Sequence, residues 1–148
     1  MDALSDAKGC IFCRIVLGEA ASSIAYEDEE TLAFLDMRQH GEGHMLVVPK
    51  RHIEDIFALD DATGAALIAT IAHVSRAVRD AFAPEGINVW QSNGAAAGQE
   101  VFHLHFHVMP RQIGDGLLRV YPGIVEHVPR EELDRQAAAI RSAMNRTT

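Results

Sequence analysis

Apolar residues spaced three and four positions apart predict three helices. The first is a short helix from Cys10 to Leu17. The second begins after an N-cap at Asp60 or Asp61 and runs to about Phe82. The third begins near Pro129, a residue that suits the first turn of a helix. The apolar stripes of the two longer helices are Leu67, Ile71, Val74 and Val78, and Leu133, Ala137, Ile140 and Met144.

Short apolar runs bounded by polar or glycine-containing segments predict five strands. They span Ile24–Glu27, Thr31–Leu35, His44–Pro49, Ile87–Gln91 and Val101–Met109. The first two lie close enough in sequence to form a hairpin. We expect the fifth strand to end before Pro110, because proline lacks the N–H that a ladder needs. The length of 148 residues fits one domain over residues 1–148.

Composition narrows the class of protein. The 21 acidic and 13 basic side chains leave a net charge of -8, which argues against a nucleic-acid partner and favours a small ligand. The first eight residues lack the apolar core of a signal peptide, and no run approaches the roughly 18 apolar residues of a membrane span. We therefore expect a cytoplasmic protein with no membrane partner.

Three histidines alternate along the fifth predicted strand. Because strand side chains point to opposite faces in turn, His103, His105 and His107 should share one face. A merely exposed polar face would be served equally well by Thr, Lys or Glu. Imidazole is both a metal ligand and a nucleophile or base at neutral pH, so both kinds of chemistry stay open.

Two cysteines indicate a possible metal site. Cys10 and Cys13 stand three apart on the first predicted helix, where both sulfurs share a face and form either half of a metal site or a redox pair. Two histidines would complete a tetrahedral zinc shell. Such a shell has no open position for water, so the zinc would be structural, and the remaining histidines would be left for catalysis.

The segment from Gly98 to Arg111, GQEVFHLHFHVMPR, resembles the signature of the histidine triad (HIT) superfamily. Other motifs follow in family order: CIFC at 10–13, LAFLD at 32–36, GHMLVVPKRH at 43–52 and SNG at 92–94. The chain looks like the bacterial Hint-like branch with a Cys-x-x-Cys zinc site. This resemblance implies an α+β, HIT-like fold, with an antiparallel meander-like sheet, one long helix and a C-terminal helix.

The resemblance also implies an activity. A homodimer would bind a purine nucleotide and hydrolyse nucleoside phosphoramidates at the α-phosphate, without an organic cofactor. His105 would attack phosphorus to form a nucleotidyl-histidine intermediate that water hydrolyses. His107 would contact the phosphate and His44 would support the nucleophile. The implied catalytic set is therefore His44, His103, His105 and His107.

Ligand roles follow from the same resemblance. Asp36 would accept hydrogen bonds from the ribose hydroxyls, while Asn93 and Gln99 would face the phosphate. The implied nucleotide site comprises Ile11, Phe12, Ile15, Phe34, Asp36, Asn93 and Gln99. The implied zinc ligands are Cys10, Cys13, His52 and His103.

Three alternatives remain open: a diadenosine polyphosphate hydrolase, a nucleotide-binding regulator with negligible turnover, and a hydrolase with a metal on three histidines. Two residues depart from the family pattern. Glu100 stands where relatives commonly place a serine, and its carboxylate should repel a phosphate unless it turns away. His40 matches no family role.

Overall fold

The computed structural model describes residues 9–117, 123 and 127–144. The chain divides into two compact units, Met1–Leu117 and Leu118–Thr148. The first holds helices α2 (Ile11–Val16) and α3 (Asp61–Phe82), strands β1 (Ile24–Glu27), β2 (Thr31–Leu35), β3 (Met45–Pro49), β4 (Gly86–Gln91) and β5 (Phe106–Arg111), and 3-10 turns η1 (Ile56–Ala58) and η2 (Ala95–Ala97). The second holds α4 (Arg130–Met144), close to the predicted third helix. A single domain over all 148 residues stays a prediction. Among the described residues, no helix combines the length and apolarity needed to cross a membrane.

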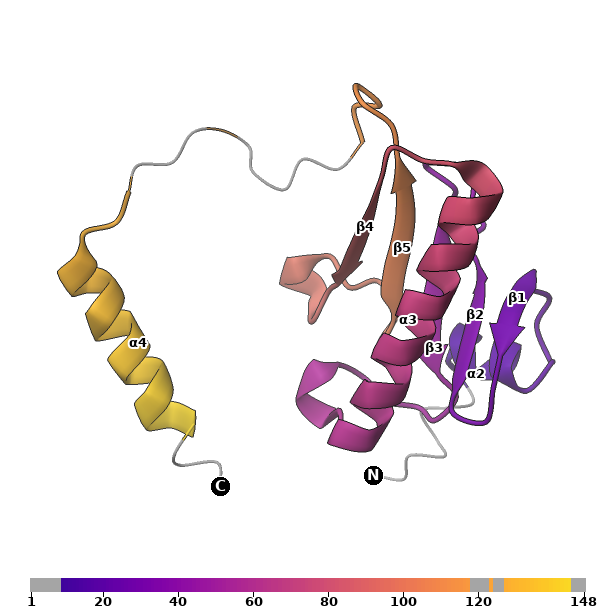
Figure 1. The fold of residues 1–148 in the computed structure, drawn as a ribbon. Coiled ribbons are helices and arrows are strands. Elements are labelled where there is room, and N and C mark those ends of the chain that lie inside the picture. Colours follow the sequence, from indigo (N-terminus) through magenta and orange to yellow (C-terminus); the bar gives the residue numbers. More distant parts are fainter. Residues whose placement is uncertain (1–8, 118–122, 124–126, 145–148) are drawn as a thin grey trace. The chain divides into compact units, whose positions relative to one another are not determined.

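The five strands form one antiparallel sheet in the order β1-β2-β3-β5-β4 (Figure 1). β1 and β2 form the predicted hairpin, and the Asp28 carboxylate closes its turn by accepting from the backbone N–H of Thr31 at 2.7 Å. β5 lies between β3 and β4, which places it inside the sheet. The expected α+β architecture is therefore confirmed.

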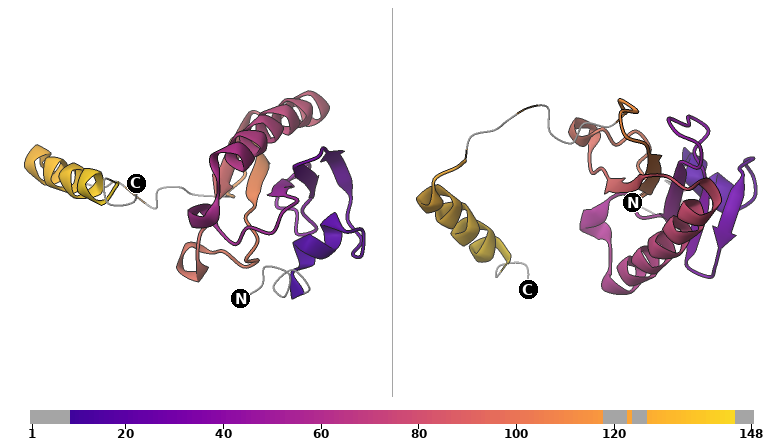
Figure 2. Two further views of the ribbon diagram at one scale, coloured as in Figure 1. Left: turned by 90° about the horizontal axis from the view of Figure 1, so that it is seen from below. Right: turned by 45° about the horizontal axis from the view of Figure 1, so that its top comes forward.

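Helices α3 and α2 cover opposite faces of the sheet (Figures 1 and 2). The predicted N-cap of α3 is Asp60, whose carboxylate accepts from the backbone N–H of Thr63 at 3.0 Å. Strand side chains alternate between the two helices. Ala33, Met45, Val47 and Val108 pack with the buried stripe of α3, whereas Leu32, Phe34, Leu46 and Val48 pack with Phe12 and Ile15 of α2.

The fifth strand differs from its prediction at both ends. Residues 101–105 are irregular rather than extended, because their polar groups bond outside the ladder: the Leu104 N–H donates to the Ile53 carbonyl at 2.6 Å. At the other end, β5 continues through Pro110 to Arg111. The pairing of β3 with β5 ends at Val108, so the missing N–H of Pro110 costs no bond on that side.

A close approach of backbone to side chain fixes the loop between β2 and β3. Gly43 has φ +86°, and a Cβ there would lie 2.7 Å from ring atoms of Phe82 at the end of α3. A Cβ on Gly41 would lie 3.3 Å from the Pro110 carbonyl oxygen. Position 43 requires glycine because its φ is positive and because a Cβ would clash with the Phe82 ring. The loop that carries residues 36–42 is thereby held against β5.

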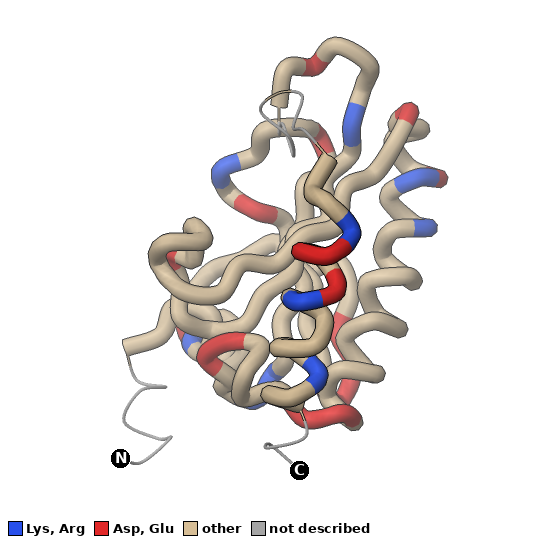
Figure 3. Tube along the Cα trace, turned by 90° about the vertical axis from the view of Figure 1, so that its left-hand side faces the viewer, with Lys and Arg blue, Asp and Glu red and all other residues tan. Residues whose placement is uncertain are grey.

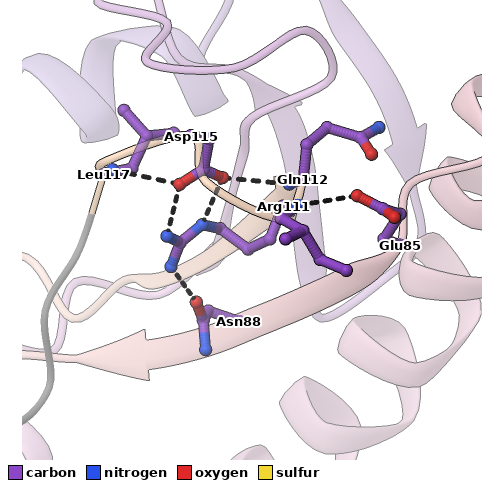
Figure 4. Close-up of polar contacts among 7 residues, drawn as sticks. Glu85, Asn88, Arg111, Gln112, Asp115 and Leu117 are labelled. Carbon is purple, nitrogen blue, oxygen red and sulfur yellow. Dashed lines mark hydrogen bonds and ion pairs between the residues drawn. The ribbon is translucent and has the colours of Figure 1, made fainter.

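A polar network holds the end of β5 and the turn that follows it (Figure 4). The Arg111 guanidinium donates to the Asp115 carboxylate at 2.6 and 2.8 Å and to the Asn88 amide oxygen of β4 at 2.5 Å. Asp115 also accepts from the backbone N–H groups of Gln112 and Leu117. These bonds tie the turn to the β4–β5 end of the sheet.

Basic residues of the described chain are spread over several elements, with acidic residues among them (Figure 3). Many pair within the molecule, as Lys50 does with Glu27 at 2.8 Å and Arg111 with Asp115. The absence of a nucleic-acid partner stays a prediction.

Candidate active site and metal-binding cluster

A cavity of about 940 Å³ opens on the face of the sheet that packs against α2. This volume lies within the usual range for small-molecule sites. The sequence-predicted residues Ile11, Phe12, Ile15, Phe34, Asp36, His44, His105 and His107 all line it. So do Met37, Arg38, His40, Leu46, Trp90, Ser92, Glu100 and Val101, among others.

His105 is held in one orientation by the backbone. Its ring is buried, and Nδ1 lies 2.7 Å from the carbonyl oxygen of His103. A carbonyl can only accept, so Nδ1 carries the proton and donates. In a neutral imidazole the other nitrogen, Nε2, is then bare. The cavity wall therefore contains a histidine whose free lone pair is fixed by a main-chain hydrogen bond.

His107 is positioned by two neighbours. It pairs with Trp90 across β4 and β5, and the two rings stack with centroids 4.3 Å apart and planes 1° from parallel. On its other side, His107 Nδ1 lies 2.9 Å from His44 Nε2. Within the described chain, the buried Nδ1 of His44 has no hydrogen-bond partner.

The tautomers of His44 and His107 follow from this network. Leaving a bare lone pair unpaired at His44 Nδ1 costs less than burying an unpaired N–H there, so we place the His44 proton on Nε2. His44 then donates to His107 Nδ1, which leaves His107 with a proton on Nε2. The ligand atoms of Asp36, His44 and His107 also lie within 4.8 Å of one another. This arrangement uses the His107 Nδ1 lone pair for a hydrogen bond rather than for a metal.

Burial keeps the imidazoles of the cavity neutral. It lowers the pKa of His107 to about 4, helped by the nearby His105 and His44 rings. Burial also lowers the pKa of His105, against the raising effect of its bond to the His103 carbonyl and of the Asp36 and Glu100 charges. The pKa of His44 is lowered by burial as well. At pH 7 these rings offer lone pairs and N–H donors rather than positive charge.

Three predicted residues lie outside the cavity lining. Gln99 is buried, and its amide donates to the Glu54 and Val101 carbonyls and accepts from the Gly94 N–H at 2.7 Å. Asn93 accepts from the Ile56 N–H at 2.8 Å and bonds to the Gln91 amide. Because both amides are committed to the loop, they shape it rather than present a donor to the cavity.

His103 is the third of these residues, and its ring lies with the cysteines instead. Its Nε2 lies 2.8 Å from the Pro49 carbonyl oxygen and therefore donates to it. Its contribution to the cavity is the backbone carbonyl that orients His105. The other ring nitrogen, Nδ1, lies 3.4 Å from Cys10 Sγ, so the ring faces the cysteines rather than the cavity. The direct catalytic role that the resemblance implies for this ring stays a prediction.

The four predicted zinc ligands come together behind the cavity wall. The ligand atoms of Cys10, Cys13, His52 and His103 all lie within 4.8 Å of one another. Cys13 Sγ lies 3.2 Å from His52 Nδ1, and His103 Nδ1 lies 3.4 Å from Cys10 Sγ. The bond to Pro49 leaves His103 Nδ1 bare and aimed at the sulfurs, as a metal ligand requires. Two thiols and two imidazoles suit a tetrahedral zinc ion.

The pKa of Cys13 argues against a redox pair. Burial, with the hydrogen bond and charge of Cys10, raises the pKa of the Cys13 thiol to about 12. Reactive cysteines need a lowered pKa, because the thiolate is the nucleophile. A bound cation would supply the missing compensation for a thiolate at this position.

The residues that line the cavity without a role predicted from the sequence include Trp90 and Arg38. Trp90 was part of a predicted strand, and only the β4–β5 register shows that it faces His107. Arg38 follows Asp36 by two residues, and it forms an ion pair with Glu100. Glu100 therefore does not stand in the cavity as an unpaired negative charge.

Comparisons with known proteins agree with this geometry. The HIT domain family model matches residues 17–114. "Protein hit" from Bacillus subtilis is 41% identical over 135 residues, covering 90% of this chain and 93% of the relative. "Adenylylsulfatase HINT3" from Arabidopsis thaliana is 33% identical over 137 residues, covering 93% and 68%. A crystal structure of a Zn-bound histidine triad family protein from Mycobacterium smegmatis is 36% identical, with a TM-score of 0.71 and coverage of 96% and 99%.

Removing one cysteine should test the metal cluster. Cys10→Ser should lower the melting temperature and the zinc content more than it lowers kcat, because the ligands lie behind the cavity wall and zinc binding stabilises the fold. Elemental analysis and thermal unfolding measure the two effects. Wild-type protein purified without chelator that holds no stoichiometric metal would contradict the assignment.

The pKa of His107 can be tested by NMR titration. We expect a value near 4 in the ligand-free protein, because burial disfavours the charged ring. Trp90→Ala exposes one face of the ring and should raise the pKa toward the ordinary value of about 6.5. An unchanged pKa in Trp90→Ala would show that Trp90 does not cause the shift.

Proposed function

Because the chain belongs to the HIT domain family, we propose that it hydrolyses purine nucleotides at the α-phosphate through a nucleotidyl-histidine intermediate. One observation carries this proposal: the His105 ring lines the cavity with Nδ1 bonded to the His103 carbonyl, so that Nε2 is a bare nucleophile. The name of the Arabidopsis relative, an adenylylsulfatase, supports hydrolysis of an adenylyl compound.

In the first step, the Nε2 lone pair of His105 attacks the α-phosphorus. An N–P bond forms, and the bond from phosphorus to the leaving group breaks. The leaving group departs with the bonding electron pair and, if it is an amine, takes up a proton from solvent. The Nδ1–H of His105 stays on the His103 carbonyl, whose dipole stabilises the positive charge that develops on the ring.

In the second step, a water oxygen attacks the same phosphorus. The P–N bond breaks, its electron pair returns to Nε2, and the attacking water releases its proton to solvent. The Nε2–H of His107 is available to donate to a phosphate oxygen in both steps. His44 holds His107 in that tautomer through the 2.9 Å bond.

The apolar end of the cavity suits a purine base. Phe12, Ile15 and Phe34 are buried there, and Phe12 contacts the His105 ring edge-on with centroids 5.2 Å apart. The Asp36 side chain also lines the cavity, is 13% exposed, and has a carboxylate that can accept from ribose hydroxyls. We propose a nucleoside phosphoramidate as the substrate.

Zinc has a structural part in this proposal. When bound by Cys10, Cys13, His52 and His103, it would crosslink α2 to the segment that precedes β5. Those are the two elements that carry the base pocket and the nucleophile. The ligands lie away from the reacting atoms, so no step uses the metal.

We also propose that the protein is a homodimer. β4 forms one edge of the sheet and exposes Val89, and such an edge is able to pair with a second copy. Light scattering at low micromolar concentration should report about twice the 16.2 kDa chain mass. A mass of one chain under those conditions would contradict the dimer.

Replacing the nucleophile should separate catalysis from binding. His105→Ala should abolish hydrolysis of adenosine 5′-phosphoramidate and keep nucleotide binding measurable, because the base pocket remains. A rapid denaturing quench at alkaline pH, where the P–N bond survives, followed by mass spectrometry should find a nucleotide on the wild-type chain only. His73→Ala, which changes an exposed histidine on α3, is the matched control.

If His105→Ala retains a tenth or more of wild-type kcat, His105 is not the nucleophile. Wild-type protein that binds the nucleotide without turning it over would support the regulator instead. A higher kcat/KM for a diadenosine polyphosphate than for the phosphoramidate would favour the polyphosphate hydrolase.

A further inference from the structure

One ion pair joins the two loops that border the cavity. Arg38 lies in the loop after β2, and Glu100 lies in the segment that leads to the histidines. The Arg38 guanidinium donates to the Glu100 carboxylate, and both side chains line the cavity. They are 72% and 65% exposed, which places them at its mouth.

Arg38 is the cation of this cavity. Among the described residues that line it, Arg38 is the sole lysine or arginine, and Asp36 and Glu100 are the acids. The lining histidines can lose their proton near neutral pH, whereas a guanidinium stays charged. Among these residues, therefore, only Arg38 offers a permanent positive charge to a second negative charge on a bound nucleotide.

Arg38 can exchange the Glu100 carboxylate for another anion. An ion pair as exposed as this one contributes little to stability, so Arg38 leaves Glu100 at little cost. A guanidinium binds phosphate and sulfate oxygens through two parallel N–H bonds as readily as it binds a carboxylate. An anion beside the α-phosphate would compete directly with Glu100 for Arg38.

We propose that Arg38 selects the leaving group by charge, with Glu100 as its exchangeable counterion. An anionic leaving group, such as sulfate or phosphate, takes Arg38 from Glu100 as the bond to the α-phosphorus breaks, and the guanidinium neutralises the charge that it carries away. An amine leaving group gains nothing from Arg38. This inference rests on the proposed hydrolysis at the α-phosphate and names the residue that decides between substrates of that reaction.

The contact with Arg38 changes the effect that the Glu100 carboxylate should have on an anionic substrate. On sequence alone its carboxylate would repel a phosphate, but in the structure its charge is offset by Arg38. Glu100 therefore acts by occupying Arg38. Removing the carboxylate should help an anionic leaving group, whereas removing the guanidinium should harm it.

Kinetics with two substrates test whether Arg38 selects the leaving group by its charge. In Arg38→Gln, kcat/KM for adenosine 5′-phosphosulfate should fall by about tenfold or more, the size expected for a lost charge-assisted bond, and adenosine 5′-phosphoramidate should change by less than about twofold. Glu100→Gln should raise kcat/KM for the phosphosulfate. Arg79→Gln breaks a similarly exposed ion pair on α3 and should change neither substrate.

If the pair only latches the two loops, Arg38→Gln and Glu100→Gln will shift both substrates in the same direction. That result, or no effect of Arg38→Gln on the phosphosulfate, would overturn the proposal.

A binding measurement keeps the test independent of turnover. In a His105→Ala background, Arg38→Gln should weaken ADP, whose β-phosphate marks the leaving-group position, by about tenfold and leave adenosine 5′-phosphoramidate nearly unchanged. Equal weakening of the two ligands would contradict the role of Arg38. Isothermal titration calorimetry measures both affinities. If the wild type binds both ligands and hydrolyses neither substrate, the proposed function fails, while these affinities still decide whether Arg38 recognises the anionic group.

Discussion

The hydrogen bond from His105 Nδ1 to the His103 carbonyl is the constraint on which the site depends. His103 makes this bond with its backbone, while its ring spans from the Pro49 carbonyl to the two sulfurs. One residue thus connects the metal-binding cluster, strand β3 and the nucleophile. Any shift of that backbone would turn the His105 ring, so a structural metal behind the wall would stabilise catalytic geometry without touching substrate.

Burial sets the electrostatics around that bond. The Trp90 ring desolvates His107 and the Phe12 ring desolvates His105, and this burial lowers the pKa of both imidazoles and keeps them neutral at pH 7. A neutral His105 keeps the lone pair that attack requires, and a neutral His107 still donates one N–H. The cost is that the rings cannot balance a highly charged substrate, so charge recognition falls to the exposed Arg38 at the mouth.

Local patterns predicted most of the fold. The α3 stripe, the β1–β2 hairpin and β3 follow from periodicity and turn residues that act within a few positions. Residues 101–105 were predicted to be part of a strand and are not, and the cause is nonlocal. Leu104 and His103 form hydrogen bonds with the Ile53 and Pro49 carbonyls, which lie far away in sequence. The four residues that the motif resemblance named for zinc lie together, and those it named for the base line one cavity. The Arg38–Glu100 pair joins positions 62 apart, which no local pattern connects.

The proposed attack requires one tautomer of His105, and long-range ¹H–¹⁵N NMR of the ring measures that tautomer. At neutral pH, selectively labelled wild-type protein should show a proton on Nδ1 and a bare Nε2, since the His103 carbonyl can only accept. Removal of the metal should broaden or shift these signals more than those of the exposed His73. A His105 ring that is protonated on Nε2, or that is charged at neutral pH, would contradict the assignment of Nε2 as the attacking atom.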